Sequence, residues 1–398
     1  MANLRPRTTR PKTPAKHPFE LPPQGVLRTY MARAKETIEN PFVGITPDGK
    51  VTPGLFSIRK TGVSVQPIID AARALLTALT AEQKATASFG VDDKAWELWC
   101  NVHPYLVRHG VCLDDLNDEQ RGHGLDLIRA SMSAAGYRTA RDVMKLNETI
   151  REITGRNEEY GEWMYWMSIF GAPSAEEPWG WQIDGHHLII NCFVLSDQIV
   201  MTPNFMGSEP VYAESGKYAG TRVFNEEESS GLALMKSFSA PQRQQATIAM
   251  QLPFDAFTTA FRDNVHLKYE GLRYDEMSDE QRASLTRLIE LYIGRVRPGH
   301  AEIRLEEVKH HLKETYFAWI GNVDDQSPFY YRVHSPVILI EFDHQPGIAL
   351  DNDEHSRNHI HTLVRTPNGN DYGKDLLRQH YEQFDHSHPH TPHRLGKI

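Results

Sequence analysis

Cysteine is scarce in this chain, which has three in 398 residues. Cys100, Cys112 and Cys192 are widely spaced and stand among apolar residues, so we expect reduced, buried thiols rather than a disulfide framework. Long apolar runs are also missing. None approaches the ~18 residues that a membrane span requires, and we therefore predict no membrane partner.

The chain also has fewer basic residues than acidic ones, 43 against 52. The formal net charge is −9, which argues against a nucleic-acid partner because binding to phosphates needs concentrated positive charge. Basic residues do gather in residues 1–24, which we predict to be a disordered tail. This tail lacks the apolar stretch of a signal peptide, so a cytoplasmic location is expected. Its Arg, Lys and Thr content leaves an organelle transit sequence open.

Several familiar catalytic motifs do not occur. The chain has no phosphate-binding loop of the Walker type, no Gly-x-Gly-x-x-Gly, no Gly-x-Ser-x-Gly and no His-Glu-x-x-His. Interpretations as a nucleotide-binding protein, an α/β-hydrolase or a zincin therefore find no support.

What is present predicts an α+β fold of antiparallel sheets with packed helical segments. Hydrophobic residues make up 40% of the chain, enough for a sizeable core. We expect a single domain, residues 25–384, followed by a flexible His-rich tail, residues 385–398. The expected elements are an entry hairpin at 41–64, helices within 66–155, strands within 158–223, helices at 226–250 and 278–296, strands at 316–322, 329–344 and 358–366, and a last helix capped by Asp371.

A short sequence motif occurs four times along the chain. In each copy a Thr, Asn or Ser is followed three residues later by Gln, as a capping box requires, so each copy predicts a helix start. The copies are LTAEQK from residue 79, LNDEQR from 116, FSAPQR from 238 and MSDEQR from 277. Their spacing leaves open a loose internal duplication, because capping chemistry alone also generates such a pattern.

Two histidines stand two residues apart in the last expected strand, NHIHTLVRT. Because side chains alternate across a strand, His359, His361 and Arg365 share one face while apolar residues take the other. The two histidines lie roughly 7 Å apart at the backbone, near enough to share a metal ion. The alternative is a partly exposed polar strand face.

A second histidine pair opens the apolar strand DGHHLIINCFV. Alternation puts His186 and His187 on opposite faces, so one of them points inward. A buried histidine needs partners for both ring nitrogens, and a metal ion is one way to supply them.

A carboxylate and two arginines stand near the His-x-His strand. Glu341 lies in an apolar run, where a carboxylate is rarely buried unless it is paired or ligated. If its strand pairs with NHIHTLVRT, Glu341 comes beside His359 or His361, as a further ligand or a general base. The alternative is an ion pair with Arg332 or Arg365. Arginine also binds carboxylate or phosphate, which would suit an anionic substrate.

The Gly-His-His and His-x-His segments, together with TPNFMG and YYRVHSPVILIEF, resemble the family catalogued as domain of unknown function 3500. The resemblance covers roughly residues 65–381. It implies one shared pattern, without assigned roles, that comprises Gly185, His186, His187, Arg332, Glu341, His359 and His361.

These observations predict a metal-dependent enzyme that acts on a small, conceivably anionic molecule. The expected metal ligands are drawn from His186, His187, His359 and His361, and the expected catalytic residues are Glu341, Arg332 and Arg365. Such ligands suit zinc, iron or copper, and hydrolysis by metal-activated water is the leading chemistry. Two alternatives stay open: an iron or copper oxidoreductase that uses dioxygen at the same site, and a binding protein without catalysis.

Overall fold

The computed structural model describes residues 26–102, 108–350 and 354–383, and one mixed sheet lies at its centre. Thirteen strands of the described residues form it in the order β1-β3-β4-β5-β7-β13-β12-β11-β10-β8, with β2 paired to β3, β6 to β5 and β9 to β10. The strands are β1 (Ser88–Phe89), β2 (Val111–Cys112), β3 (Tyr165–Phe170), β4 (Trp179–Gly185), β5 (Leu188–Leu195), β6 (Gln198–Val200), β7 (Asn204–Ser208), β8 (Thr247–Ala249), β9 (Leu272–Arg273), β10 (Tyr316–Gly321), β11 (Phe329–His334), β12 (Leu339–Pro346) and β13 (His355–Arg365).

Ten α-helices accompany the sheet in the same ranges, so the expected α+β fold is confirmed. They are α1 (Val26–Glu39), α2 (Gln66–Ala78), α3 (Ala81–Ala87), α4 (Asp118–Ser131), α5 (Ala134–Thr154), α6 (Asn225–Ser237), α7 (Ala240–Ala246), α8 (Asp279–Ile293), α9 (His300–His310) and α10 (Lys374–Gln383). Within the described ranges, no helix has the length and apolar character needed to cross a membrane.

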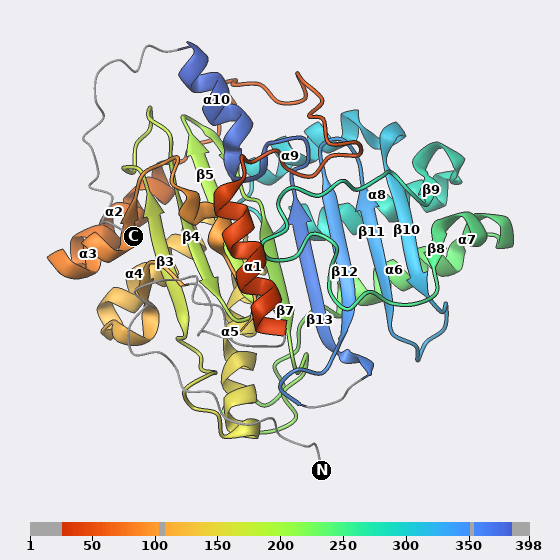
Figure 1. The fold of residues 1–398 in the computed structure, drawn as a ribbon, viewed down its shortest axis with the longest axis horizontal. Coiled ribbons are helices and arrows are strands. Elements are labelled where there is room, and N and C mark those ends of the chain that lie inside the picture. Colours follow the sequence, from red (N-terminus) through yellow and green to blue (C-terminus); the bar gives the residue numbers. More distant parts are fainter. Residues whose placement is uncertain (1–25, 103–107, 351–353, 384–398) are drawn as a thin grey trace.

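Alternation along the strands gives the sheet two different faces. On one face, apolar side chains such as Ile190 and Ile340 pack with helices that include α2, α4, α5, α6 and α8, forming the main core. Helix α1 lies over the opposite face (Figure 1), where its Tyr30 belongs to a smaller core with Phe205 and Leu363. This second face also carries most of the buried polar side chains considered below.

The two halves of the sheet repeat one topology. Strands β3, β4, β5 and β7 run inward from one edge, β10, β11, β12 and β13 run inward from the other, and β7 pairs antiparallel with β13 at the centre. Gln120 Nε2 donates to Gln83 in the first half, and Gln281 Nε2 donates to Gln242 in the second. All four predicted capping boxes are present, at Thr80, Asn117, Ser239 and Ser278. The two halves thus share one strand order, which is the arrangement that the loose internal duplication left open by the sequence would produce.

The predicted entry hairpin at 41–64 is wrong. Among those residues the structure has no strand, and Thr46 makes one parallel bridge with His266. The expected turn does form, because the hydroxyl of Thr46 accepts a hydrogen bond from the amide of Gly49. The apolar residues on its two sides pack in different places, Ile45 beside Leu339 and Phe56 in the main core, instead of against each other.

Other predicted boundaries also need correction. Within the predicted helical region 66–155, the residues around Trp96 form only a short 3-10 helix, Lys94–Leu98, and both Trp96 and Trp99 are buried. The strand expected at 329–344 is two strands, β11 and β12, with a tight connection between them. Asp371 does not cap α10, because its carboxylate accepts from the amide of Thr366. The predicted tails at 1–24 and 385–398 lie outside the described residues.

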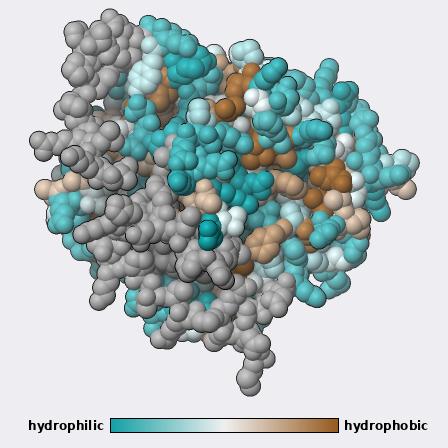
Figure 2. Space-filling model, in the orientation of Figure 1, coloured by the Kyte–Doolittle hydropathy of each residue, from teal (hydrophilic) through white to brown (hydrophobic). Residues whose placement is uncertain are grey.

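The surface seen in this orientation is mainly hydrophilic. Its visible hydrophobic residues lie in small separate groups among polar ones (Figure 2). The candidate functional residues described below are buried.

Candidate metal centre

Three buried imidazoles converge on the sheet face that α1 covers. His187 lies in the two-residue turn between β4 and β5, and His359 and His361 lie on β13. The Nε2 atom of His359 is 3.1 Å from that of His187 and 3.1 Å from that of His361. The ligand atoms all lie within 4.8 Å of one another, and each residue is at most 5% exposed. One metal ion could contact all three rings.

Strand β7 brings these distant segments together. It pairs with β5 on one side and with β13 on the other. Gly207 stands opposite His361, and its amide donates to the carbonyl oxygen of His187 at 2.8 Å. A Cβ atom at Gly207 would lie 2.8 Å from Cδ2 of His361 and 3.2 Å from Cδ2 of His187. Glycine at this position therefore leaves the space that both rings occupy.

The Gly-His-His segment forms a turn and not the start of a strand, which corrects the predicted alternation of His186 and His187. His187 has φ of 63°, a left-handed conformation that some turns place at their second central residue. Its amide donates to the carbonyl oxygen of Asn101 at 3.1 Å. The ring of His186 stacks on that of His187, with centroids 3.9 Å apart, but its Nδ1 contacts Asn147 Oδ1 at 2.8 Å. His186 is therefore a neighbour of the converging group and not one of its members.

The other ring nitrogens of the two β13 histidines have acceptors. Nδ1 of His359 donates to the carbonyl oxygen of Pro346 at 2.7 Å, and Nδ1 of His361 lies 3.3 Å from Oδ1 of Asp255. A proton held on Nδ1 leaves the Nε2 lone pair free toward the centre, which is the usual arrangement of a metal-binding histidine. Burial lowers the pKa of His359 to about 4, so this ring is neutral near pH 7.

Glu341 lies on the same sheet face but outside the imidazole group. Strands β12 and β13 do pair as the predicted hairpin, but their register puts Glu341 opposite Leu363 and not beside a histidine. Its carboxylate accepts from the amides of Phe257 at 2.7 Å and Thr258 at 3.0 Å, and from the hydroxyl of Tyr330 at 2.8 Å. The carboxylate thus holds the 257–258 backbone against the sheet.

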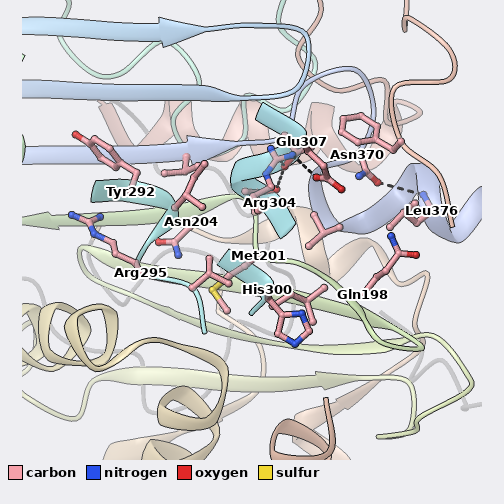
Figure 3. Close-up of a pocket in the computed structure, with 18 of the residues that line it drawn as sticks. Gln198, Met201, Asn204, Tyr292, Arg295, His300, Arg304, Glu307, Asn370 and Leu376 are labelled. Carbon is pink, nitrogen blue, oxygen red and sulfur yellow. Dashed lines mark hydrogen bonds and ion pairs between the residues drawn. The ribbon is translucent and has the colours of Figure 1, made fainter. Parts of the chain in front are cut away.

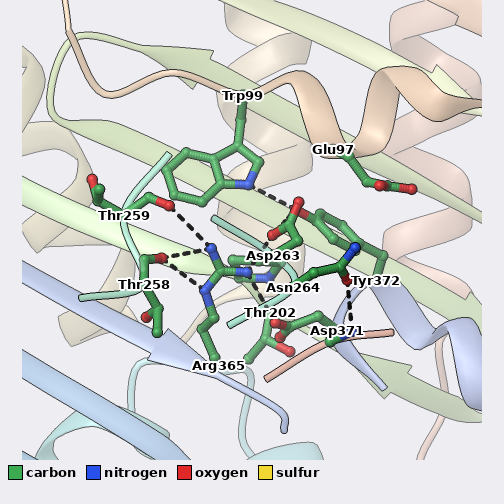
Figure 4. A network of polar contacts seen from close by, with 12 residues as sticks. Glu97, Trp99, Thr202, Thr258, Thr259, Asp263, Asn264, Arg365, Asp371 and Tyr372 are labelled. Atoms are coloured by element: carbon green, nitrogen blue, oxygen red, sulfur yellow. Dashed lines mark hydrogen bonds and ion pairs between the residues drawn. The ribbon is translucent and has the colours of Figure 1, made fainter. Parts of the chain in front are cut away.

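Arg365 is the centre of a buried polar network (Figure 4). Its guanidinium pairs with Asp263 at 2.5 Å and Asp371 at 3.1 Å, and donates to the carbonyl oxygen of Thr258. The hydroxyl of Tyr372 donates to Asp263 at 3.1 Å. This network ties the 258–263 segment to the end of β13.

Arg332 lies directly across from Glu341 on β11 and is 1% exposed. It pairs with Glu270 at 2.9 Å. Both predicted arginines are thus engaged with carboxylates of the chain itself, and the catalytic roles given to Arg332, Arg365 and Glu341 stay predictions.

Sequence reasoning missed two acidic residues near the imidazoles. Asp343 stands directly opposite His361 and is completely buried, and burial raises the pKa of its carboxyl well above the usual range. Strand alternation was enough to find it, because Asp343 is two residues from Glu341 and shares its face. Asp255 lies outside the regular strands and carries no periodic signal, so only the fold reveals that it meets His361.

Comparison with known proteins gives a family without an assigned activity. A family model described as "Protein of unknown function (DUF3500)" matches residues 61–374, which is more than half of the chain. Neither the curated proteins nor the solved structures include a significant match.

Proposed function

The chain belongs to the DUF3500 family of proteins of unknown function. From the three converging histidines, we propose that it is a metal-dependent enzyme acting on a small molecule. The leading chemistry is hydrolysis by a metal-activated water. His187, His359 and His361 would hold the ion.

The single observation that carries this proposal is the convergence of three buried imidazoles. Two nitrogen ligands bound about 2.0–2.1 Å from a zinc ion in tetrahedral geometry lie about 3.3 Å apart. Two of the three pairs, His187–His359 and His359–His361, have Nε2 separations of 3.1 Å, close to that value. Three protein ligands also leave a fourth position for water or substrate, as catalytic zinc sites do.

When bound, a zinc ion lowers the pKa of a bound water and polarises a substrate oxygen. The chain's own residues would orient the ligands. Pro346 and Asp255 fix the Nδ1 protons of His359 and His361. We assign Glu341 a positioning role, since it holds the backbone two residues beyond Asp255.

The ligand set favours zinc over non-haem iron. Iron enzymes that use dioxygen often combine two histidines with one carboxylate, whereas three histidines are a known zinc set. Among the described residues, the group that could hold an ion contains three histidines and no carboxylate. Copper also binds imidazole ligands, so the test below includes the oxidoreductase alternative.

Elemental analysis of untagged protein, purified without added metal, tests the proposal. We expect about one zinc ion per chain in the wild type and a loss of nearly all of it in the His359→Ala/His361→Ala variant. The histidines near the end of the chain are a second place where metal could bind. The control therefore replaces its histidines with alanine, at His386, His388, His390 and His393.

Each outcome of the metal measurement favours one of the functions. Stoichiometric zinc that depends on His359 and His361 supports hydrolysis, and stoichiometric iron or copper supports the oxidoreductase. A substoichiometric metal content that is unchanged in the double variant would contradict the metalloenzyme proposal. It would favour a binding protein without catalysis.

A further inference from the structure

A recess lies on the sheet face that packs in the main core, which is the face away from the candidate metal centre. Figure 3 shows residues that line it. The recess is partly open to solvent. Asn204 of β7 and Val364 of β13, which pair where the two halves of the sheet meet, both line it. Their neighbours Phe205 and Leu363 point to the other face. The recess is therefore separate from the imidazole group, although the same two strands build both.

Two buried polar atoms at this recess lack hydrogen-bond partners among the described residues. They are Oδ1 of Asn204 and Nε2 of His300, in residues that are 7% and 4% exposed. Both side chains line the recess and come from different elements, β7 and the start of α9 (Figure 3). Buried polar atoms are normally paired, so these two indicate groups that a ligand would satisfy.

The two atoms are both acceptors. The backbone of Ser64 favours the protonated form of the His300 ring, and because Nε2 has no partner among the described residues, we place the ring proton on Nδ1. The proton on Nδ1 leaves a lone pair on Nε2. Burial lowers the pKa of His300, so the ring is neutral near pH 7. The amide oxygen of Asn204 also accepts.

Both arginines that line the recess are already engaged with carboxylates of the chain. The pairs are Arg295 with Glu227 and Arg304 with Glu307 at 3.2 Å. Glu307 also contacts Arg59 at 2.9 Å. A charged ligand would therefore lose its hydration without gaining a free counter-charge. Much of the remaining lining is apolar, with Ile199, Val200, Met201, Ile293, Val296 and Leu376.

We propose that this recess binds a neutral small molecule with an apolar body and two hydrogen-bond donors, of which a diol is the simplest kind. Its donors bind Asn204 Oδ1 and His300 Nε2, and its body lies against the apolar lining. The proposal does not rest on the metal centre.

The test compares three probes of one size on the full-length protein, by calorimetric titration. They are trans-1,2-cyclohexanediol, cyclohexanone and cyclohexanecarboxylate. We expect the diol to bind with a Kd at least about tenfold lower than cyclohexanone, which has no donor for the two acceptors. The carboxylate should bind no better than cyclohexanone.

Variants then assign the binding to this recess. Asn204→Leu and His300→Phe should each raise the Kd for the diol about tenfold. The Gly122→Ala variant, a change in α4 away from the recess, should bind the diol as the wild type does. Equal diol binding by the wild type and both recess variants would overturn the proposal, and so would tighter binding of the carboxylate.

Crystals of the wild type soaked in the diol give a readout that does not depend on whether the variants fold. We expect the two hydroxyl oxygens within hydrogen-bond distance of Asn204 Oδ1 and His300 Nε2. Ordered water alone on both atoms, at a diol concentration that saturates the titration, would contradict the proposal.

Discussion

Asp255 gives His361 what a backbone carbonyl gives His359, an acceptor for the Nδ1 proton. The same carboxylate accepts from the hydroxyl of Tyr30 at 2.8 Å, so it connects α1 to the imidazole group. Carboxylates in this position orient a metal-bound histidine and raise its basicity.

We therefore predict that Asp255→Asn weakens zinc binding about 10- to 100-fold, measured by competition with a chromophoric chelator. The control is Tyr30→Phe, which removes the other contact of the carboxylate and leaves its charge. That variant should change zinc affinity much less. Equal zinc affinities of Asp255→Asn and the wild type would refute the orienting role.

Individual residues differ in how far sequence could place them. His359 and His361 share a face with Arg365 because strand alternation is set by geometry. The prediction is confirmed, since His361 and Arg365 have partners on β12 and the Nε2 atoms of His359 and His361 lie 3.1 Å apart. Strand alternation could not predict that His187 belongs to the imidazole group. Its place depends on a left-handed turn and on a strand from another part of the chain.

Elements set by local chemistry were predictable. All four capping boxes form because the cap and the glutamine are three residues apart and need no distant partner. The β12–β13 hairpin was also expected, but its register was not, because register depends on packing across the whole sheet. The failed hairpin at 41–64 has the same cause, since distant parts of the core take up its apolar residues.

Strand β7 offers a test at this scale, because Gly207 leaves room for two imidazoles. We predict that Gly207→Ala displaces the rings of His361 and His187, weakens zinc binding at least about tenfold and costs about 1–3 kcal/mol of unfolding free energy. Chelator competition and denaturant titration measure the two effects.

The matched control for that change is Gly122→Ala in α4, where an added Cβ meets nothing within 4 Å. This substitution should leave zinc affinity unchanged and stabilise the protein by a few tenths of a kcal/mol, up to ~1. If Gly207→Ala kept the zinc affinity of the wild type, the three rings would not need the space that we infer.

At the scale of the whole molecule, the candidate metal centre joins the two halves of the duplicated sheet. His187 comes from the first half, and His359 and His361 come from the second. The recess on the other face also lies at this junction, where Asn204 pairs with Val364. A two-fold repeat creates one unique central seam, and the two candidate sites have formed on its opposite faces.

A bound ion at the seam should therefore stabilise the association of the halves. We predict that a chelator lowers the unfolding free energy of the wild type by about 4 kcal/mol relative to protein in free zinc at 1,000 times its Kd. Denaturant titration gives the value. Hydrogen exchange should become faster in the β4–β5 turn and in β13, the two segments that carry the ligands.

The His359→Ala/His361→Ala variant distinguishes this effect from chelation elsewhere. It should show no further loss of stability with chelator, and its exchange pattern at the β4–β5 turn should resemble that of stripped wild type. Zinc bound by the histidines of residues 385–398 would instead be removed equally from both proteins. An equal chelator effect on wild type and double variant would therefore place the metal away from the seam and remove the basis for a link between the two halves.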